Sequence, residues 1–157
     1  MRASNLIVGL MLAGQRYALY LAQVERVIRA VEVVHLPAAP AIIAGVINVQ
    51  GRVIPVINIR RRFRLPEREM ALSDHMIVAR TARRTIALLV DATMGVIELP
   101  QNQVVHSPFI LPDMEYVEGV VKLEDGLILI HNLDTFLALE EEQALDHALP
   151  DPAGRPQ

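Results

Sequence analysis

The residue types that could carry nucleophilic or metal chemistry are few in this chain and widely spaced. It has five histidines and no cysteine; the histidines are His35, His75, His106, His131 and His147. No two of them stand at the His-x-His or His-x3-His spacing that brings two imidazoles to one metal ion. Without cysteine the chain forms neither a disulfide nor a thiolate centre. We therefore predict no metal site, and we expect His131, inside an apolar run, to be a packed strand residue.

Carboxylates and serines also give no strong catalytic signal. Asp91 and Asp134 could be paired for acid–base work, but such a pair needs a pocket and a fixed separation. The simpler interpretation of Asp91 is a side chain that accepts hydrogen bonds from turn amides. No serine lies in a nucleophile-elbow motif, and neither a Walker loop nor a GxGxxG motif occurs. The sequence predicts no enzyme and no cofactor.

The densest charge lies in the run Arg60-Arg61-Arg62-Phe63-Arg64, with Arg68 beyond it. Arg60, Arg62 and Arg64 are candidates for electrostatic contact with phosphate or with an acidic protein surface. The alternative is a solvated loop between two parts of the fold. The net charge of the chain is −3, whereas polyanion-binding proteins are usually basic. Nucleic-acid binding is therefore the less favoured reading of this run.

The composition predicts the elements that must position these residues. Of the 157 residues, 52% are hydrophobic and only 4% are aromatic, and the apolar residues are largely Val, Ile, Leu and Ala. β-Branched side chains favour pleated, half-buried surfaces, so we expect a mainly β fold. No apolar run reaches the roughly 20 residues of a membrane-spanning helix. The run 6–13 is read as a first strand rather than a signal peptide.

The two halves of the chain repeat one order of features, about 70 residues apart. The strand–turn–strand pattern of residues 6–21 recurs at 76–90. A glycine-bounded hairpin at 45–59 recurs at 119–133. A Leu-Pro or Ser-Pro step precedes the hairpin in each half, and Asn58 and Asn132 occupy similar places near the hairpin ends. The order of the matches predicts two related β-lobes.

Turn and strand signals refine this picture. Gln50-Gly51 and Asp125-Gly126 are predicted tight turns, because glycine accepts positive φ without a Cβ clash. Pro55 lacks an N–H, so its strand is expected to be an edge strand or to be bulged there. The run 53–59 is apolar on both sides, and we expect the other lobe to cover one face and its own barrel the other.

Two further segments need assignment. Residues 21–25 are predicted to form a turn, followed by a strand over 27–34. The apolar spacing also allows a helix over 21–31. Asp134 can cap a helix over about 135–146, and 150–157 is predicted to be a disordered tail.

Several blocks together resemble the CheW-like domain family over about residues 5–140. The most telling are Leu36-Pro37-x-x-Pro40, Gly45-Val46-Ile47-Asn48-x-x-Gly51, Val53-Ile54-Pro55-Val56-Ile57-Asn58-Ile59-Arg60-x-Arg62-Phe63, Tyr116-Val117-Glu118-Gly119-Val120 and Leu127-Ile128-Leu129-Ile130-His131-Asn132-Leu133-Asp134.

The resemblance implies two SH3-like, five-stranded β-barrel lobes packed together, with a short C-terminal helix. We expect one domain over 1–149, with lobes at roughly 14–82 and 83–139 and a strand over 5–13 assigned to neither.

The resemblance also implies a non-catalytic adaptor in chemotaxis signal transduction. Its partners would be the cytoplasmic helical hairpin of chemoreceptors and the regulatory domain of a CheA-type histidine kinase. Its place would be the cytoplasm, at inner-membrane receptor arrays, without membrane insertion or nucleic acid. A related chemosensory pathway, controlling pili or gene expression, is the alternative. The matching positions assigned to the partner-facing surface are Val24, Val27, Gly45, Asn48 and Gly51.

Two positions depart from the family pattern. Typical members carry Asn-Leu-Arg-Gly where this chain has Asn48-Val49-Gln50-Gly51, and often an acidic residue where it has Arg26. In the family that Arg and that acid can pair. Because both positions have changed, we expect the fold to survive and the adaptor surface to differ.

Overall fold

The computed structural model describes residues 6–99, 104–106 and 116–149. The predicted tail at 150–157, the Ser107-Pro108 step and the first five residues lie outside the described part of the chain. Strands dominate the described residues: β1 Leu6–Leu12, β2 Gln15–Tyr20, β3 Val24–Arg29, β4 Ile43–Val49, β5 Arg52–Ile57, β6 His75–Arg80, β7 Thr85–Val90, β8 Ala92–Glu98, β9 Val104–His106, β10 Val117–Leu123 and β11 Gly126–His131. The helices are α1 Ile59–Arg62 and α2 Leu139–Ala148, and the 3-10 turns are η1 Leu21–Gln23 and η3 Leu133–Thr135.

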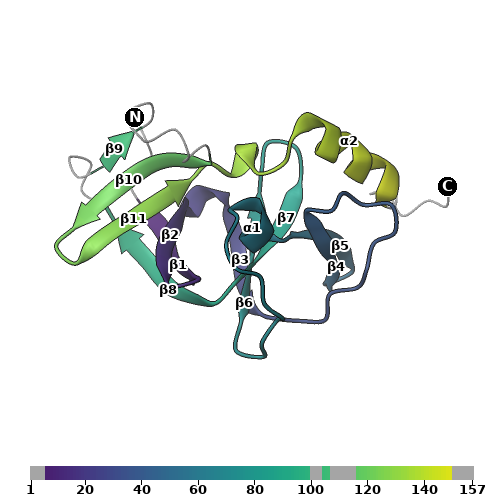
Figure 1. Ribbon diagram of the computed structural model, residues 1–157, viewed down its shortest axis with the longest axis horizontal. Helices are drawn as coiled ribbons and strands as arrows, with labels where there is room; N and C mark the ends of the chain where they lie inside the picture. The colour runs from purple at the N-terminus through teal and green to yellow at the C-terminus, as the bar shows by residue number, and fades with distance from the viewer. Residues whose placement is uncertain (1–5, 100–103, 107–115, 150–157) are drawn as a thin grey trace.

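The strands form two sheets, which Figure 1 shows as two lobes side by side. One sheet has the order β8-β1-β2-β11-β10-β9, and the other β3-β6-β7-β5-β4. The prediction of a mainly β protein with two lobes and a short C-terminal helix is confirmed. One sheet has six strands rather than five, because the short β9 adds to it.

The internal repeat appears in the topology, but the halves exchange strands. In each sheet a hairpin from one half is joined with strands of the other half: β1 and β2 with β8, β9, β10 and β11, and β6 and β7 with β3, β4 and β5. The contacts match in direction, since β2 runs parallel to β11 and β7 runs parallel to β5. The predicted lobe boundary between residues 82 and 83 is therefore wrong as a division of strands, because it cuts the β6–β7 hairpin. The unassigned strand, β1, belongs to the six-stranded sheet.

Each sheet closes on itself at the same place in the repeat. After β3 the chain returns to the far strand, where Val34 and Val46 exchange two backbone hydrogen bonds of 2.8 Å. After β8 the chain returns as β9, which pairs with β10. Because the β3 continuation makes only an isolated bridge, it is not a sixth strand. This closure brings β3 and β4, at opposite ends of the sheet order, onto one side of the lobe.

Three apolar clusters result. One lies within the six-stranded sheet and includes Ile7 and Ile128, and one lies within the other sheet and includes Ile54 and Val56. The largest lies between the two sheets and takes residues from both, Ile57 among them. The strand that carries Pro55 is thus covered on both faces, as its sequence predicts.

Pro55 itself lies in an interior strand, because β5 pairs with both β4 and β7. The edge-strand prediction is wrong for a local reason. Pro55 is registered opposite Val46, whose own N–H and C=O both bond to Val34. The backbone nitrogen of Pro55 therefore faces away from β4, so no hydrogen bond to β4 is lost. On its other side, β5 pairs with β7 only at Val56 and Ile57. The irregularity lies in β4, between Ile43 and Gly45.

The other segment predictions also meet the structure. A 3-10 turn and a strand occupy residues 21–29, so the turn is confirmed, the strand begins earlier than predicted and the alternative helix is absent from this segment. The C-terminal helix begins at Leu139 after the cap residue Ala138. Asp134 does not cap it, because its carboxylate accepts a hydrogen bond of 2.7 Å from the Ala82 amide instead.

Tyr17, Phe63 and Phe136 gather around His131, between the sheets. The imidazole centroid lies 4.5 Å from that of Tyr17, 4.4 Å from Phe63 and 5.5 Å from Phe136. His131 is 2% exposed, and this burial lowers its pKa to about 3. The packed-residue interpretation of His131 is confirmed, at the junction of the lobes.

We expect acid to destabilise the protein through His131 before its carboxylates titrate. In the unfolded chain the imidazole binds a proton below about pH 6.5, whereas in the folded protein it stays neutral down to about pH 3. Protonation therefore favours the unfolded chain, and the free energy of unfolding falls as the pH is lowered below about 6.5. Between pH 6.5 and pH 5 the loss is about 2 kcal/mol. Asp74 and Asp91, whose pKa values are lowered, lose their contributions only below about pH 4. Urea unfolding at both pH values tests this, with His131→Phe expected to flatten the profile; an equally steep profile in that variant would contradict it.

Candidate functional site

The closure of the five-stranded sheet brings the predicted partner-facing positions to one side of the molecule. Val24 and Val27 lie on β3, while Gly45, Asn48 and Gly51 lie on the β4–β5 hairpin. Val27 is 40% exposed, and Asn48 and Gly51 are exposed. These residues can meet a partner directly.

Two of the predicted positions are built into the fold instead. Val24 packs against the apolar cluster between the sheets. Gly45 is buried, with φ at +153°, and a Cβ there would lie 2.4 Å from the Val34 carbonyl oxygen. Gly45 is therefore required for the backbone approach that closes the sheet, and it offers no side chain to a partner.

The hairpin turn is shaped by its own residues. Gln50 and Gly51 both have positive φ, at 52° and 83°, which is the conformation of a type I′ turn. The Asn48 side chain accepts a hydrogen bond of 2.9 Å from the Gly51 amide. The predicted turn at Gln50-Gly51 is confirmed, and the side chain of Gln50 is exposed to solvent there.

The two departures from the family pattern meet at this turn. Nη2 of Arg26 donates to Oε1 of Gln50 over 3.4 Å. No described carboxylate pairs with Arg26. The neighbouring Glu25 is already engaged, since it pairs with Arg52 at 2.9 Å and accepts a hydrogen bond from Thr85. Arg26 thus presents a positive charge against a neutral amide.

Two of the four arginines in the run 60–64 face inward, unlike the exposed contact that the sequence allows. Arg60 pairs with Asp91 at 2.7 Å and is 13% exposed. Arg62 pairs with Glu141 of α2 at 2.6 Å and is 15% exposed. Arg61 pairs with Glu67 at 3.4 Å. Of the predicted contact residues, only Arg64 is exposed without a partner in the described part of the chain. Arg60 and Arg62 therefore form ion pairs within the fold instead of a basic surface patch.

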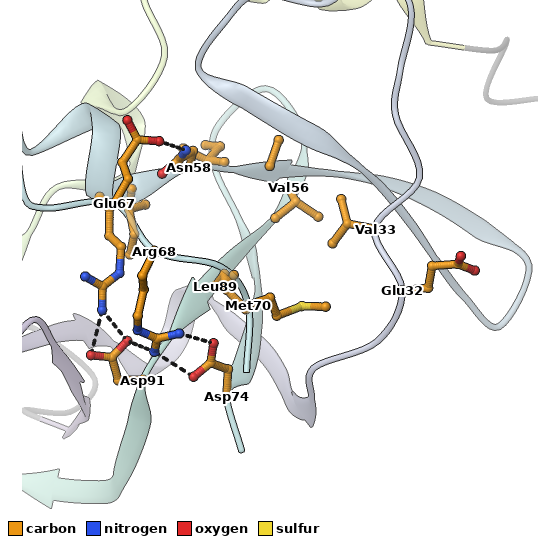
Figure 2. Close-up of a pocket in the computed structure, with 14 residues that line it drawn as sticks. Glu32, Val33, Val56, Asn58, Glu67, Arg68, Met70, Asp74, Leu89 and Asp91 are labelled. Atoms are coloured by element: carbon orange, nitrogen blue, oxygen red, sulfur yellow. Dashed lines mark hydrogen bonds and ion pairs between the residues drawn. The ribbon is translucent and has the colours of Figure 1, made fainter. Parts of the chain in front are cut away.

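A pocket of about 390 Å³ lies beside the Arg60–Asp91 ion pair, along β5 and the loop that precedes β6. Figure 2 shows apolar Val33, Val56 and Leu89 on one part of its wall. It also shows Arg68 between two carboxylates: Arg68 lies 2.8 Å from Asp74 and 2.6 Å from Asp91.

The charges around the pocket compensate one another. Burial would raise the pKa of Asp91, but hydrogen bonds from Arg60 and from the Ala13 amide, with the charge of Arg68, hold it below its usual value. The hydrogen bond from Arg68 likewise lowers the pKa of Asp74. Both acids are ionised and paired at neutral pH, so neither is available as a proton donor.

Asp91 and Asp134 do not form a pair. Asp91 accepts a 3.0 Å hydrogen bond from the Ala13 turn amide, as the simpler interpretation predicts, and Asp134 serves a different turn. Within the described ranges no three His, Asp or Glu side chains are arranged to hold a metal ion. No described helix is long and apolar enough to cross a membrane.

Comparison with known proteins agrees with this geometry. The model of the CheW-like domain matches residues 6–141. The chain belongs to the CheW-like family. A protein named Chemotaxis protein CheW from Rhizobium meliloti (strain 1021) is 32% identical over 111 residues, which cover 69% of this chain and 72% of the relative. The Chemotaxis protein CheW of Bacillus subtilis (strain 168) is 30% identical over 145 residues and 91% of each chain.

A solved CheW structure shares the fold. The crystal structure of the scaffolding protein TtCheW from Thermoanaerobacter tengcongensis superposes with a TM-score of 0.79 at 29% identity, over 88% of this chain and 95% of that one. The two-lobed architecture described above is therefore the architecture of a CheW-like domain.

Sequence reasoning missed the carboxylates that order this CheW-like site from within. Asp74 and Glu25 lie in no motif, and the side chains of Arg68 and Thr85 that bond to them are 6 and 60 residues away along the chain. One signal was available: Asn58 and Asn132 recur in the two halves, and each accepts a hydrogen bond from a main-chain N–H in the turn that follows, at Arg61 and Asp134 respectively.

Proposed function

We propose that this chain is a non-catalytic adaptor that couples chemoreceptors to a CheA-type histidine kinase. It would act in the cytoplasm, at receptor arrays of the inner membrane. Membership of the CheW-like family and the chemotaxis names of its relatives support this. The TtCheW title calls that relative a scaffolding protein, which fits a protein that acts by surface contact.

The observation that carries the proposal is the exposed side of the five-stranded lobe. There β3 and the β4–β5 hairpin place Val27, Asn48 and the Gln50-Gly51 turn on the surface. Asp74 and Asp91 of the pocket are paired with arginines, which suits binding better than proton transfer. An exposed valine beside polar turn groups suits contact with an amphipathic helix, such as a receptor hairpin.

Binding to nucleic acid is the weaker candidate. Of the arginines that suggested nucleic-acid binding, Arg60 forms an ion pair with Asp91 and Arg62 with Glu141 within the fold. A related chemosensory pathway is the stronger alternative, because Arg26 and Gln50 change the charge of the partner-facing side. The adaptor would then serve its own receptor or kinase rather than a standard one.

The double substitution Arg26→Glu with Gln50→Arg tests the divergent surface. The two side chains already lie 3.4 Å apart, so the variant would place an ion pair of the usual family polarity at this site. We expect binding to a standard receptor hairpin to strengthen on the order of ten-fold, since charge complementarity across an interface governs partner choice. Pull-down and titration against a receptor hairpin whose own CheW carries the usual Arg and acid would measure it. No gain over the unmodified chain would contradict the divergent-surface reading.

Co-purification tests the function itself. The full chain should be retained by a CheA regulatory domain and by receptor hairpins from the bacterium that encodes it. Failure to bind both would overturn the adaptor proposal.

A further inference from the structure

The pocket of about 390 Å³ lies at the end of the five-stranded lobe opposite the Gln50-Gly51 turn. Its lining includes Ile57, where β5 ends, Asp74, just before β6, and Asp91, just after β7. These strand ends are the ones farthest from the β4–β5 and β6–β7 turns. The mouths of closed β-sheets are common places for small-molecule sites, and the volume lies within the range of such sites.

Ion pairs hold the wall that is formed by the loop before β6. Arg68 of this loop lies 2.8 Å from Asp74 and 2.6 Å from Asp91, and Asp74 is 2% exposed. Arg60 lies 2.7 Å from Asp91 and donates to the Pro66 carbonyl oxygen over 2.7 Å. The wall is therefore ordered without a ligand, which lowers the entropy cost of binding one.

The charges of the lining disfavour an anionic ligand. Four carboxylates and two guanidinium groups line the pocket, so its formal charge is −2. Both guanidinium groups, of Arg60 and Arg68, already donate to carboxylates and to main-chain oxygens. An anion would have to displace these bonds and would be repelled by the excess of acids.

Two of the carboxylates are open to a cation. Glu32 is exposed beyond β3 and has no ion-pair or hydrogen-bond partner among the described residues. Glu67 pairs with Arg61 at 3.4 Å, where both side chains are 49% exposed, and it accepts a hydrogen bond from Asn58. Because an exposed pair of this kind contributes little, a second cation can share the Glu67 carboxylate.

Apolar side chains separate these two acids. In Figure 2, Val33 and Val56 lie between Glu32 and Glu67, and Leu89 also lines the pocket. A carbon chain can cover this apolar wall while each of its ends reaches one carboxylate. A bare metal ion would leave the wall unused, and within the described ranges no three His, Asp or Glu side chains are arranged to hold one.

We propose that this pocket binds a small aliphatic diamine, with one ammonium group at Glu32 and the other at Glu67. The carbon chain between the two ammonium groups lies on Val33 and Val56. Aliphatic amines are protonated at neutral pH, so such a ligand is a dication with an apolar stem. The site lies at the other end of the lobe from the Gln50-Gly51 turn, and it adds a ligand to the adaptor function without depending on that function.

Calorimetric titration of the full chain with putrescine, cadaverine and hexamethylenediamine tests the proposal. Low salt is used, because exposed ion pairs are screened at high salt. We expect dissociation constants on the order of millimolar for the diamine whose length fits the site. That diamine should bind about three- to five-fold more tightly than the monoamine of the same chain length, since it makes one more exposed ion pair. Adipate, a dianion of matched length to hexamethylenediamine, should not bind.

Four variants locate the site. Glu32→Gln and Glu67→Gln should each reduce the affinity for the diamine to that for the monoamine. Glu69→Gln is the matched control, because Glu69 is an exposed acid of the same loop that does not line the pocket; it should bind as the unmodified chain does. Ala44 lines the pocket and is exposed, so Ala44→Phe should fill the pocket and abolish binding while the protein stays folded.

The outcomes that would overturn the inference are separate from those that bear on the adaptor function. Failure of all three diamines to bind overturns it, as does equal affinity for the diamine and its monoamine. Unchanged affinity in both glutamine variants, or in Ala44→Phe, places the binding elsewhere and also overturns it. Binding of a CheA regulatory domain or a receptor hairpin is measured independently, so either proposal can fail while the other stands.

Discussion

Replacing Glu142 by Ala is expected to lower the free energy of unfolding by about 3–5 kcal/mol. Glu142 of α2 is 5% exposed and lies 2.5 Å from Nε of Arg84, in the turn between β6 and β7. Arg84 also donates to the Glu142 carbonyl oxygen over 3.2 Å and pairs with Asp146. Removing the carboxylate leaves a guanidinium that is only 13% exposed with Asp146, itself 52% exposed, as its one remaining carboxylate partner in the described structure, and the lost pairing outweighs the lower cost of desolvation.

Urea unfolding, followed by circular dichroism, measures this effect. Glu140→Ala is the matched control, because Glu140 lies on the same helix, is exposed and has no described partner; its change should stay within about 0.5 kcal/mol. The double variant Arg84→Leu with Glu142→Leu should recover much of the loss, since a buried pair can be replaced by apolar groups. Equal stability of the Glu142 and Glu140 variants would show that the ion pair does not hold the helix.

The substitution Gly45→Ala is expected to cost about 4 kcal/mol. The backbone at Gly45 has φ at +153°, and a Cβ would stand 2.4 Å from the Val34 oxygen and 2.7 Å from Val33. Backbone strain at such a φ costs roughly 1–3 kcal/mol, and forced repacking adds roughly 1–3 kcal/mol. The Val34–Val46 hydrogen bonds that close the lobe would be displaced first.

Gly51→Ala is the control for strain alone. Gly51 also has positive φ, at 83°, but nothing lies within 4 Å of its Cβ position, so its cost should be about 1–2 kcal/mol. Similar losses in both variants, measured by urea unfolding, would contradict the steric argument. A Gly45 variant that loses partner binding should therefore be read as a distorted lobe rather than as a lost contact.

Local features of the fold follow from the sequence because they depend on neighbours along the chain. The turn at Gln50-Gly51 needs positive φ at two adjacent residues, and the strand–turn–strand pattern of 6–21 reads directly as β1 and β2. The repeat of features in the two halves also predicts two related β-lobes, and the two sheets that form have matching strand orders. In each of these cases the stabilising contacts lie within a hairpin or recur with it.

Features that depend on distant partners could not be read in this way. Arg60 and Asp91 are 31 residues apart, and Arg62 and Glu141 are 79 apart. An arginine looks the same in sequence whether water or a buried carboxylate surrounds it, so the run 60–64 suggests an exposed patch. Asp134 likewise has the right type and place for a helix cap, but its carboxylate bonds to the Ala82 amide, 52 residues away, and the helix begins only at Leu139.

The sequence by itself determined that this is a mainly β protein of repeated hairpins in the CheW-like family, because periodicity, turn residues and motif order are properties of the chain alone. Only the tertiary structure decided which half supplies which strands to each sheet, since long-range pairing depends on burying the apolar faces of both halves together. It also decided which arginines face solvent. Arg60 and Arg62 are turned inward by carboxylates, and Arg26 is left outward because its neighbour Glu25 is already bound by Arg52.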